Sequence, residues 1–165
     1  MSTKIIKYII LFVFFGAIFF FFSVKKGGFF YTDSGSMEPT IRPGDRIVLM
    51  KTGSIKKSDI IIFKSPEDTE TYLVKRVIGL PGDVVEIAGG QLYLNGKPMD
   101  EPYLKESFIV YKYDLAQVPS GKLFVLGDNR NNSDDSTVWG FLPAENIRGK
   151  VIFRYWPLNR LSRIR

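Results

Sequence analysis

The sequence opens with a nearly continuous apolar run and continues with short apolar runs that polar turn residues separate. Tyr8 to Val24 carries no charge and is rich in phenylalanine. Two pairs of lysines flank this run, namely Lys4, Lys7, Lys25 and Lys26. As a helix the run spans roughly 25 Å, and lysines that reach toward water extend it to a hydrocarbon core of about 30 Å. We predict one transmembrane helix here, with a cleavable signal peptide as the alternative.

The rest of the chain shows a pattern typical of β-strands. It predicts strands at Arg46 to Met50, Ile60 to Phe63, Thr71 to Ile78, Val84 to Ile87, Gln91 to Leu94, Phe108 to Tyr111, Lys122 to Leu126 and Val151 to Tyr155. The pairs Gly89-Gly90 and Asn95-Gly96 favour tight hairpins, and only residues 143–146 resemble the first turn of a helix. We therefore expect a mostly β domain at residues 28–165, preceded by an anchor segment at residues 1–27.

The composition limits the chemistry, because the chain of 165 residues contains neither histidine nor cysteine. A Ser-His-Asp triad, a Cys-His pair and a metal site with imidazole or thiolate ligands are therefore excluded. A serine nucleophile in this chain would need a carboxylate or a lysine as its base. The absence of cysteine also fits a domain outside the cytoplasm, where stray disulfides form.

The net charge of +6 is mild, and basic residues without neighbouring acids gather at the C-terminus. They are Arg148, Lys150, Arg154, Arg160, Arg163 and Arg165. Beside a membrane anchor, such residues favour contact with anionic lipid headgroups over contact with nucleic acid. A solvated C-terminal tail is the alternative.

Three stretches hold candidate chemistry, and the first is Ser34 to Thr40. Gly35 allows backbone conformations that are closed to other residues, and Pro39 disfavours a helical conformation at the residue before it. We therefore expect Ser36 in a tight loop with its hydroxyl exposed. Such a serine suits a nucleophile, and it equally suits a plain surface turn.

The second stretch is the strand from Thr71 to Ile78. Period-2 alternation places Lys75 in an apolar row and Arg76 on the opposite face. Burial among apolar side chains lowers the pKa of a lysine from its ordinary value of about 10.4, which makes Lys75 a candidate base near neutral pH. A lysine that reaches water from the edge of the sheet is the alternative.

The third stretch runs from Gly127 to Ser136 and is rich in small polar residues. Side chains of this kind form loops by bonding to their own backbone, and carboxylates among them can hold an arginine. A calcium loop is one alternative, although Arg130 stands among its would-be ligands. An ordinary polar loop is another.

Together, in their order and residues, these stretches resemble the type I signal peptidases, which are membrane-anchored bacterial serine peptidases with a Ser/Lys dyad. Four motifs carry the resemblance, namely Ser34 to Thr40, Gly44 to Val48, Lys75 to Asp83 and Gly127 to Ser136. Arg154 to Leu158 is also similar to the C-terminal segment of many members. The resemblance implies a signal-peptidase-type antiparallel β domain, with only a small insertion between Asp83 and Lys122.

The resemblance also implies an active site. Ser36 would be the acylated nucleophile, and Lys75 would be the general base. The backbone N–H of Ser36 and the hydroxyl of Ser34 would form the oxyanion hole, and Ser133 would hydrogen-bond and orient the lysine amine.

Other residues would support this site. The supporting charge network would be Asp128, Arg130 and Asp135. The family usually has an arginine where this chain has Thr137, so Asp135 needs another partner, for which Arg130 is a candidate. Gly35 and Met37 are candidates for lining the substrate pocket.

The implied function is that of a membrane-bound serine endopeptidase. It would cleave N-terminal signal peptides from secreted preproteins after small residues of the Ala-X-Ala type, with no cofactor and no metal. It would be a single-pass protein of the bacterial plasma (inner) membrane, with its catalytic domain on the extracytoplasmic side and membrane lipids, but no nucleic acid, as partners. Two alternatives remain: a dedicated conjugation or pilin-processing peptidase of the same clan, and a non-catalytic membrane-anchored adaptor that binds peptides by strand addition.

Overall fold

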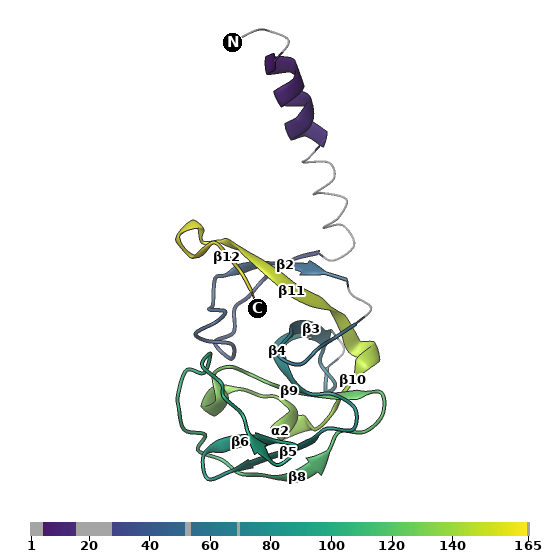
Figure 1. The fold of residues 1–165 in the computed structure, drawn as a ribbon, viewed down its shortest axis with the longest axis vertical. Coiled ribbons are helices and arrows are strands. Elements are labelled where there is room, and N and C mark those ends of the chain that lie inside the picture. Colours follow the sequence, from purple (N-terminus) through teal and green to yellow (C-terminus); the bar gives the residue numbers. More distant parts are fainter. Residues whose placement is uncertain (1–4, 16–27, 52–53, 69, 165) are drawn as a thin grey trace.

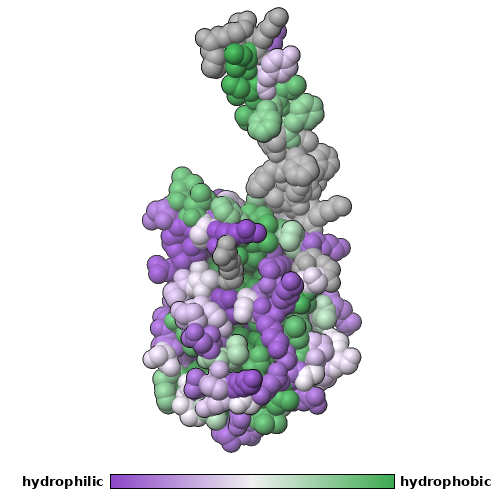
Figure 2. Space-filling model, viewed as in Figure 1, coloured by the Kyte–Doolittle hydropathy of each residue, from purple (hydrophilic) through white to green (hydrophobic). Residues whose placement is uncertain are grey.

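The computed structural model describes residues 5–15, 28–51, 54–68 and 70–164. Residues 5–15 form a helix with exposed and mainly apolar side chains, and Figure 2 shows this helix as predominantly hydrophobic. The second half of the predicted transmembrane run, residues 16–24, lies outside the described residues. Within the described ranges, no helix has both the length and the apolar run needed to cross a membrane.

The β domain consists of two antiparallel sheets (Figure 1). The eight-stranded sheet runs in the order β1 (Gly28–Tyr31), β2 (Arg46–Met50), β11 (Ile147–Trp156), β3 (Ile60–Lys64), β4 (Tyr72–Gly79), β9 (Lys122–Leu126) and β10 (Leu142–Pro143), and β12 (Ser162–Arg163) pairs with β11. The four-stranded sheet runs in the order β7 (Lys97–Pro98), β6 (Gln91–Leu94), β5 (Val84–Ala88) and β8 (Tyr113–Gln117). All pairings given for these strands are antiparallel, which confirms the predicted mostly β class.

Both predicted hairpins form in the smaller sheet. Strands β5 and β6 meet through Gly89 and Gly90, which have φ values of 57° and 82°. Strands β6 and β7 meet through Asn95 and Gly96, with φ values of 53° and 74°. Positive φ at both central residues gives a type I′ turn, whose twist matches that of the flanking strands.

Strand β3 shows why part of the sequence reads as a continuous apolar run. Its alternate residues enter two different cores on the two faces of the large sheet. Ile60 and Ile62 pack in one core together with Met37, whereas Ile61 and Phe63 pack in the other. A strand that is buried on both faces needs no polar positions, and four consecutive residues of β3 are accordingly buried.

The predicted strand at Phe108 to Tyr111 is wrong. This segment is irregular, and Ile109 is buried while its N–H donates to the Gly90 carbonyl at 3.0 Å. The strand that pairs with β5 on the side away from β6 is β8, whose residues are mostly exposed and therefore give a weak pattern. Ile109 and Tyr111 pack onto the core without joining the ladder, whereas Phe108 and Val110 are exposed.

Short elements make up the other differences from the predicted pattern. Residues 143–146 contain a 3-10 turn, η2 (Ala144–Asn146), and not the first turn of a longer helix. Two further 3-10 turns are η1 (Arg130–Asn132) and η3 (Leu158–Arg160). The sequence pattern also missed β1, β7, β10, β12 and the helix α2 (Ser136–Trp139), none longer than four residues. Elements of this length contain too few residues to show a period.

Candidate active site

Ser36 lies in a series of tight turns between β1 and β2, which we call the Ser36 loop (residues 34–41). Met37 and Ile41 anchor this loop in the core beneath it, because each is at most 2% exposed. The prediction of an exposed Ser36 was wrong, since the residue is only 9% exposed. The residue is mostly buried because the loop packs against β4 and the polar loop that follows β9, although Ser36 still lines a pocket.

Lys75 comes from β4, which lies between β3 and β9 in the large sheet. The residue is 3% exposed, which confirms the burial that the alternating pattern predicted. Its Nζ donates a hydrogen bond to Ser36 Oγ at 2.7 Å, although the two residues are 39 positions apart in the sequence. The fold therefore brings the two predicted residues into direct contact.

Burial lowers the pKa of Lys75 to about 8. The negative charges of Asp135, Asp134 and Asp128 act in the opposite direction, because they stabilise the ammonium form. Among the described residues, none of these carboxylates forms an ion pair with Lys75. With a pKa near 8, about one molecule in ten carries a neutral amine at pH 7.

The two predicted oxyanion donors lie side by side. The backbone N–H of Ser36 donates to Ser34 Oγ at 3.3 Å, so the two groups are in contact. Ser34 is exposed and lines the same pocket as Ser36. A developing negative charge placed there could accept from both, and their role as an oxyanion hole remains a prediction.

A pocket of about 190 Å³ opens beside Ser36. Its lining includes Met37, as predicted, but does not include Gly35. A Cβ added to Gly35 would come nearest to the Glu38 side chain, at 3.8 Å, so this residue faces elsewhere. The main apolar contributors to the pocket are Phe30, Met37, Ile41, Ile62, Leu73 and Val74.

The polar loop after β9, residues 127–136, packs directly on the Ser36 loop. A Cβ at Gly127 would lie 2.5 Å from the Ser36 carbonyl oxygen and 2.3 Å from Ser133 Oγ, so only glycine permits this approach. The backbone N–H of Asn129 donates to the Ser36 carbonyl, and its side-chain Nδ2 donates to the Gly35 carbonyl, both at 3.0 Å. The sequence reasoning did not single out Asn129, because nothing in a polar loop distinguishes one asparagine from its neighbours.

The predicted hydrogen bond between Ser133 and Lys75 is absent from the described residues. Ser133 Oγ is buried there without a hydrogen-bond partner, and the Lys75 amine donates to Ser36. Ser133 lies against Gly127, which in turn packs against the Ser36 carbonyl. Its position beside the site agrees with the prediction, whereas its predicted contact does not.

The predicted charge network divides into two buried ion pairs. Asp128 accepts from Arg76 Nε and Nη2, both at 2.7 Å, and the two side chains are at most 2% exposed. The Tyr103 ring covers the guanidinium of Arg76, with Cζ 3.8 Å from the ring centroid. Arg130 donates to both carboxylate oxygens of Glu101 at 2.9 and 2.5 Å. Both pairs have the two-bond geometry that makes arginine–carboxylate contacts strong.

We had expected Arg130 as a candidate partner of Asp135, but Arg130 pairs with Glu101 instead. Asp135 caps α2, and its Oδ1 accepts from the backbone N–H and the hydroxyl of Thr137 at 3.1 and 2.8 Å. Its other oxygen accepts from the Gly127 N–H at 3.1 Å. Hydrogen-bond donors, including Thr137 itself, thus satisfy the carboxylate where the family usually supplies an arginine.

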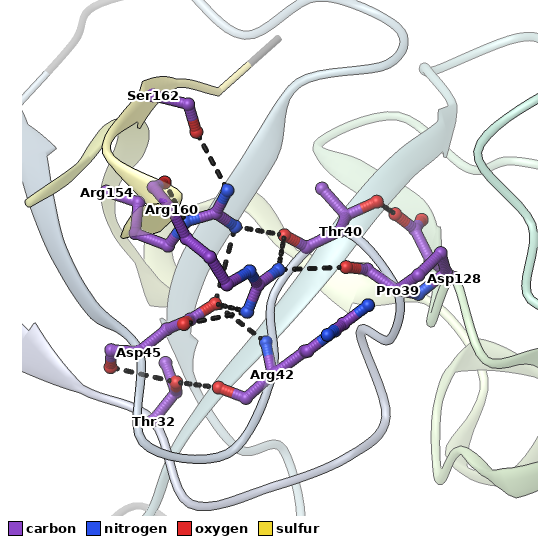
Figure 3. A network of polar contacts seen from close by, with 9 residues as sticks. All are labelled: Thr32, Pro39, Thr40, Arg42, Asp45, Asp128, Arg154, Arg160 and Ser162. Carbon is purple, nitrogen blue, oxygen red and sulfur yellow. Dashed lines mark hydrogen bonds and ion pairs between the residues drawn. The ribbon is translucent and has the colours of Figure 1, made fainter. Parts of the chain in front are cut away.

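Arginines of the C-terminal segment hold the other side of the Ser36 loop (Figure 3). Arg154 donates to the Thr40 carbonyl at 2.6 Å, and Arg160 donates to the Pro39 carbonyl at 3.1 Å. Both also form ion pairs with buried Asp45. Thr40 further donates through its hydroxyl to Asp128 at 2.5 Å.

The C-terminal cations are therefore not all free to meet lipid headgroups. Arg154 and Arg160 pair with Asp45, and Lys150 pairs with Asp59. Acids distant in the sequence become neighbours in the sheet, which a reading of the local sequence could not show. Arg148 and Arg163 remain exposed, and Arg165 lies outside the described residues. In the part of the chain that the structure describes, no three acidic side chains are grouped to hold a metal ion.

Comparison with known proteins defines the class first: the chain is a hydrolase, a serine endopeptidase. The family model described as signal peptidase, peptidase S26, matches residues 2–156, and the chain belongs to this family. It is 43% identical over 145 residues to a probable signal peptidase I-1 of Synechocystis, covering 81% of this chain and 74% of that protein. It is 37% identical over 154 residues to signal peptidase IB of Staphylococcus aureus, covering 80% of each.

A solved structure agrees with these relatives. The crystal structure of a signal peptidase I from Enterococcus faecalis superposes with a TM-score of 0.55 at 34% identity, covering 61% of this chain and 98% of that chain. The predicted family is thus confirmed, as is the enzyme class. This result favours the peptidase over the non-catalytic adaptor.

Proposed function

We propose that this signal peptidase is membrane-bound and cleaves secreted preproteins by acyl transfer through Ser36, with Lys75 as the general base. The observation that carries the proposal is the 2.7 Å contact between Lys75 Nζ and Ser36 Oγ in a buried site. A lysine whose pKa burial lowers to about 8 can accept the serine proton in a chain that has no histidine. The names of the relatives support the substrate class.

The reaction would proceed in two halves. The neutral Lys75 amine takes the proton of Ser36 Oγ as this oxygen attacks the scissile carbonyl carbon. The negative charge on the carbonyl oxygen is stabilised by the Ser36 N–H and the Ser34 hydroxyl. Collapse of the intermediate passes the proton to the leaving amine and leaves an ester on Ser36. Water that the same lysine deprotonates then hydrolyses this ester.

The pocket beside Ser36 supports a preference for small side chains. Its volume of about 190 Å³ and its apolar lining, including Met37, Ile62 and Leu73, suit short aliphatic groups. We expect cleavage after sequences of the Ala-X-Ala type. Replacing either alanine of a preprotein with a bulky residue should reduce kcat/KM by orders of magnitude, and indifference at both positions would contradict this specificity.

The test of the proposed function is cleavage of a purified preprotein by the full-length enzyme in detergent, with the new N-terminus read by mass spectrometry. We expect one cut after a small residue, and an ester-linked signal peptide on Ser36 after rapid acid quenching. Ser36→Ala should abolish both signals. An enzyme that still cleaves after this substitution would overturn the assignment.

We further propose that Tyr8 to Val24 anchors the chain as a single span, with the domain outside the cytoplasm of a bacterium. The apolar length of the run and its flanking lysines support this proposal. Exposed Arg148 and Arg163 then remain available for lipid headgroups. Protease added to intact spheroplasts should digest the β domain, whereas complete protection would contradict this orientation.

A further inference from the structure

The peptide unit between Gly35 and Ser36 carries the Gly35 carbonyl and the Ser36 N–H in one rigid plane. The peptide bond is planar, so the two groups point in opposite directions and rotate together. The Ser36 N–H is the backbone donor that the proposed mechanism needs for the oxyanion. Whatever fixes the carbonyl of Gly35 therefore also fixes the direction of this donor.

Two groups hold the Gly35 carbonyl. The Glu38 N–H donates to it at 3.1 Å from within the same turn. The second donor is Asn129 Nδ2 at 3.0 Å, from a residue 94 positions later in the sequence. The backbone N–H of Asn129 also donates to the Ser36 carbonyl at 3.0 Å. Asn129 thus holds the two peptide units on either side of Ser36, one through its side chain and one through its backbone.

Asn129 is itself firmly held. It is 2% exposed, and its own carbonyl accepts from the Asn132 N–H at 3.0 Å. The residues on either side of it, Asp128 and Arg130, belong to the two buried ion pairs described above. Its side chain makes no capping bond to η1, although Asn129 occupies the N-cap position. An asparagine in this position would ordinarily cap the helical turn, and here its amide is directed to the Ser36 loop instead.

We propose that Asn129 is a positioning residue for the oxyanion hole. Its amide fixes the peptide plane between Gly35 and Ser36, so that the Ser36 N–H is aimed before substrate arrives. A donor that is already oriented costs no reorganisation when charge develops, and loss of one such donor typically costs about 10²–10³ in kcat. The inference rests on the proposed function of Ser36, since without acyl transfer there is no oxyanion to stabilise.

The test compares two isosteric substitutions in one loop. Asn129→Asp keeps the side-chain size but replaces the amide donor with a carboxylate, which repels the Gly35 carbonyl. Asn131→Asp is the matched control, because Asn131 Nδ2 likewise donates to a backbone carbonyl, that of Phe108, away from the Ser36 loop. With the full-length enzyme and a signal-sequence peptide, we expect Asn129→Asp to lower kcat about 10²–10³-fold, with KM within threefold of the wild type. The control should keep kcat within threefold.

Two further readouts separate positioning from mere stability. A substrate-like peptide aldehyde, which forms a tetrahedral adduct with an active serine, should lose affinity for Asn129→Asp in proportion to kcat/KM. The pH at which activity is half-maximal should not move in Asn129→Ser, which removes the reach of the amide without adding charge. In Asn129→Asp the added carboxylate should move this pH upward, as the neighbouring acids already do for Lys75. Asn129→Ser should show the same loss of kcat and of aldehyde affinity, and it serves as the test if Asn129→Asp does not fold.

Three outcomes would overturn the proposal. Asn129→Asp with a kcat equal to that of Asn131→Asp would show that the amide does not aim the donor. If Asn129→Asp lowers the melting temperature and the loss of activity matches the loss of folded enzyme, while the aldehyde affinity of the folded fraction is unchanged, the role of Asn129 is purely structural. An active Ser36→Ala enzyme would overturn the proposed function together with this inference, whereas an inactive one beside a fully active Asn129→Asp overturns the inference alone.

Discussion

Each face of β4 buries one basic side chain, and the two side chains have different partners. Lys75 and Arg76 are adjacent in sequence, and they are 3% and 2% exposed. Lys75 meets a neutral hydroxyl on its face, at 2.7 Å. Arg76 meets the carboxylate of Asp128 through two bonds and is covered by a tyrosine ring. The two side chains are buried to nearly the same degree, but the kind of cation and its partner differ.

The partner determines what burial does to each cation. Without a carboxylate in contact, the desolvated ammonium of Lys75 is unfavourable and its pKa falls to about 8. An arginine keeps its charge in almost any surroundings, so Arg76 compensates for burial by pairing with Asp128. Lys75 can therefore act as a proton acceptor. The Arg76–Asp128 pair instead supports the Ser36 loop, because Asp128 also accepts a hydrogen bond from Thr40 of that loop.

The largest effect should follow from Lys75→Arg, which makes both faces alike. Arginine keeps the positive charge but cannot accept a proton near neutral pH. We expect kcat/KM to fall by about 10²–10⁴-fold, the range that a general base contributes, as for Lys75→Ala. The measurement is peptide cleavage by folded enzyme. Because Ser36 and Lys75 act as a unit, the double variant Ser36→Ala/Lys75→Ala should be no less active than Ser36→Ala alone. Substantial activity in Lys75→Arg would show that another group is the base.

Replacing Arg76, on the face opposite Lys75, should lower the stability of the domain. Arg76→Met leaves the Asp128 carboxylate buried without its cation, which typically costs about 3–5 kcal/mol. The free energy of unfolding in urea measures this loss. Arg76→Met/Asp128→Asn should recover much of it, because no lone charge remains. The strand pattern indicated only that Arg76 lies on the face opposite Lys75, and its buried pair with Asp128 is the reason for expecting so large an effect. A single variant as stable as the wild type would show that the pair contributes nothing.

Replacing Lys75 with methionine should have the opposite effect on the free energy of unfolding. A pKa lowered from 10.5 to about 8 corresponds to about 3 kcal/mol of folding free energy that the ammonium form costs below pH 8. Lys75→Met should therefore abolish activity yet stabilise the domain at pH 7, by up to about 3 kcal/mol. The unfolded chain binds more protons between pH 8 and 10.5, so wild-type stability rises through this window and the difference shrinks. A Lys75→Met enzyme that is less stable at pH 7 would contradict this account.

The activity of the wild type should report the same titration. Only the neutral amine accepts the serine proton, so kcat/KM should rise about tenfold per pH unit below pH 8 and level off above it. The profile is measured with a small peptide whose own groups do not titrate in this range. Arg163→Gln, which alters an exposed cation, should leave the midpoint unchanged, and a midpoint near 10.5 would show that Lys75 is not desolvated in the working enzyme.

The smallest effect concerns the carboxylate next to the Lys75 face. Thr137→Val removes the hydroxyl that donates to Asp135 at 2.8 Å but keeps the side-chain shape. We expect a loss of about 1 kcal/mol in the free energy of unfolding, with kcat nearly unchanged. Thr71→Val removes a similar bond to Asp68 on the exposed surface and should cost less. Equal losses at both sites would show that burial of Asp135 does not matter.

The regular strands of this protein were predictable because their pattern is local. Strands β2, β6 and β9 begin and end at the predicted residues, and both glycine-containing hairpins form as predicted. Their period-2 patterns and turn residues act over a few neighbours, so a single sequence reveals them. The strand predicted at Phe108 to Tyr111 failed, because residues such as Ile109 can pack on a core without joining a sheet.

The sequence by itself determined which chemistry this protein could perform. The lack of histidine and cysteine left a carboxylate or a lysine as the candidate base, and the alternation in β4 indicated that Lys75 is buried. Only the tertiary structure decided the partners. It paired Asp128 with Arg76, Arg130 with Glu101 and Asp45 with the C-terminal arginines, left Ser133 without its expected contact, and placed Asn129 on the Ser36 loop. These contacts join segments up to 115 residues apart. Strand pairing and core packing set such contacts, whereas local patterns report only which face of a strand a residue occupies.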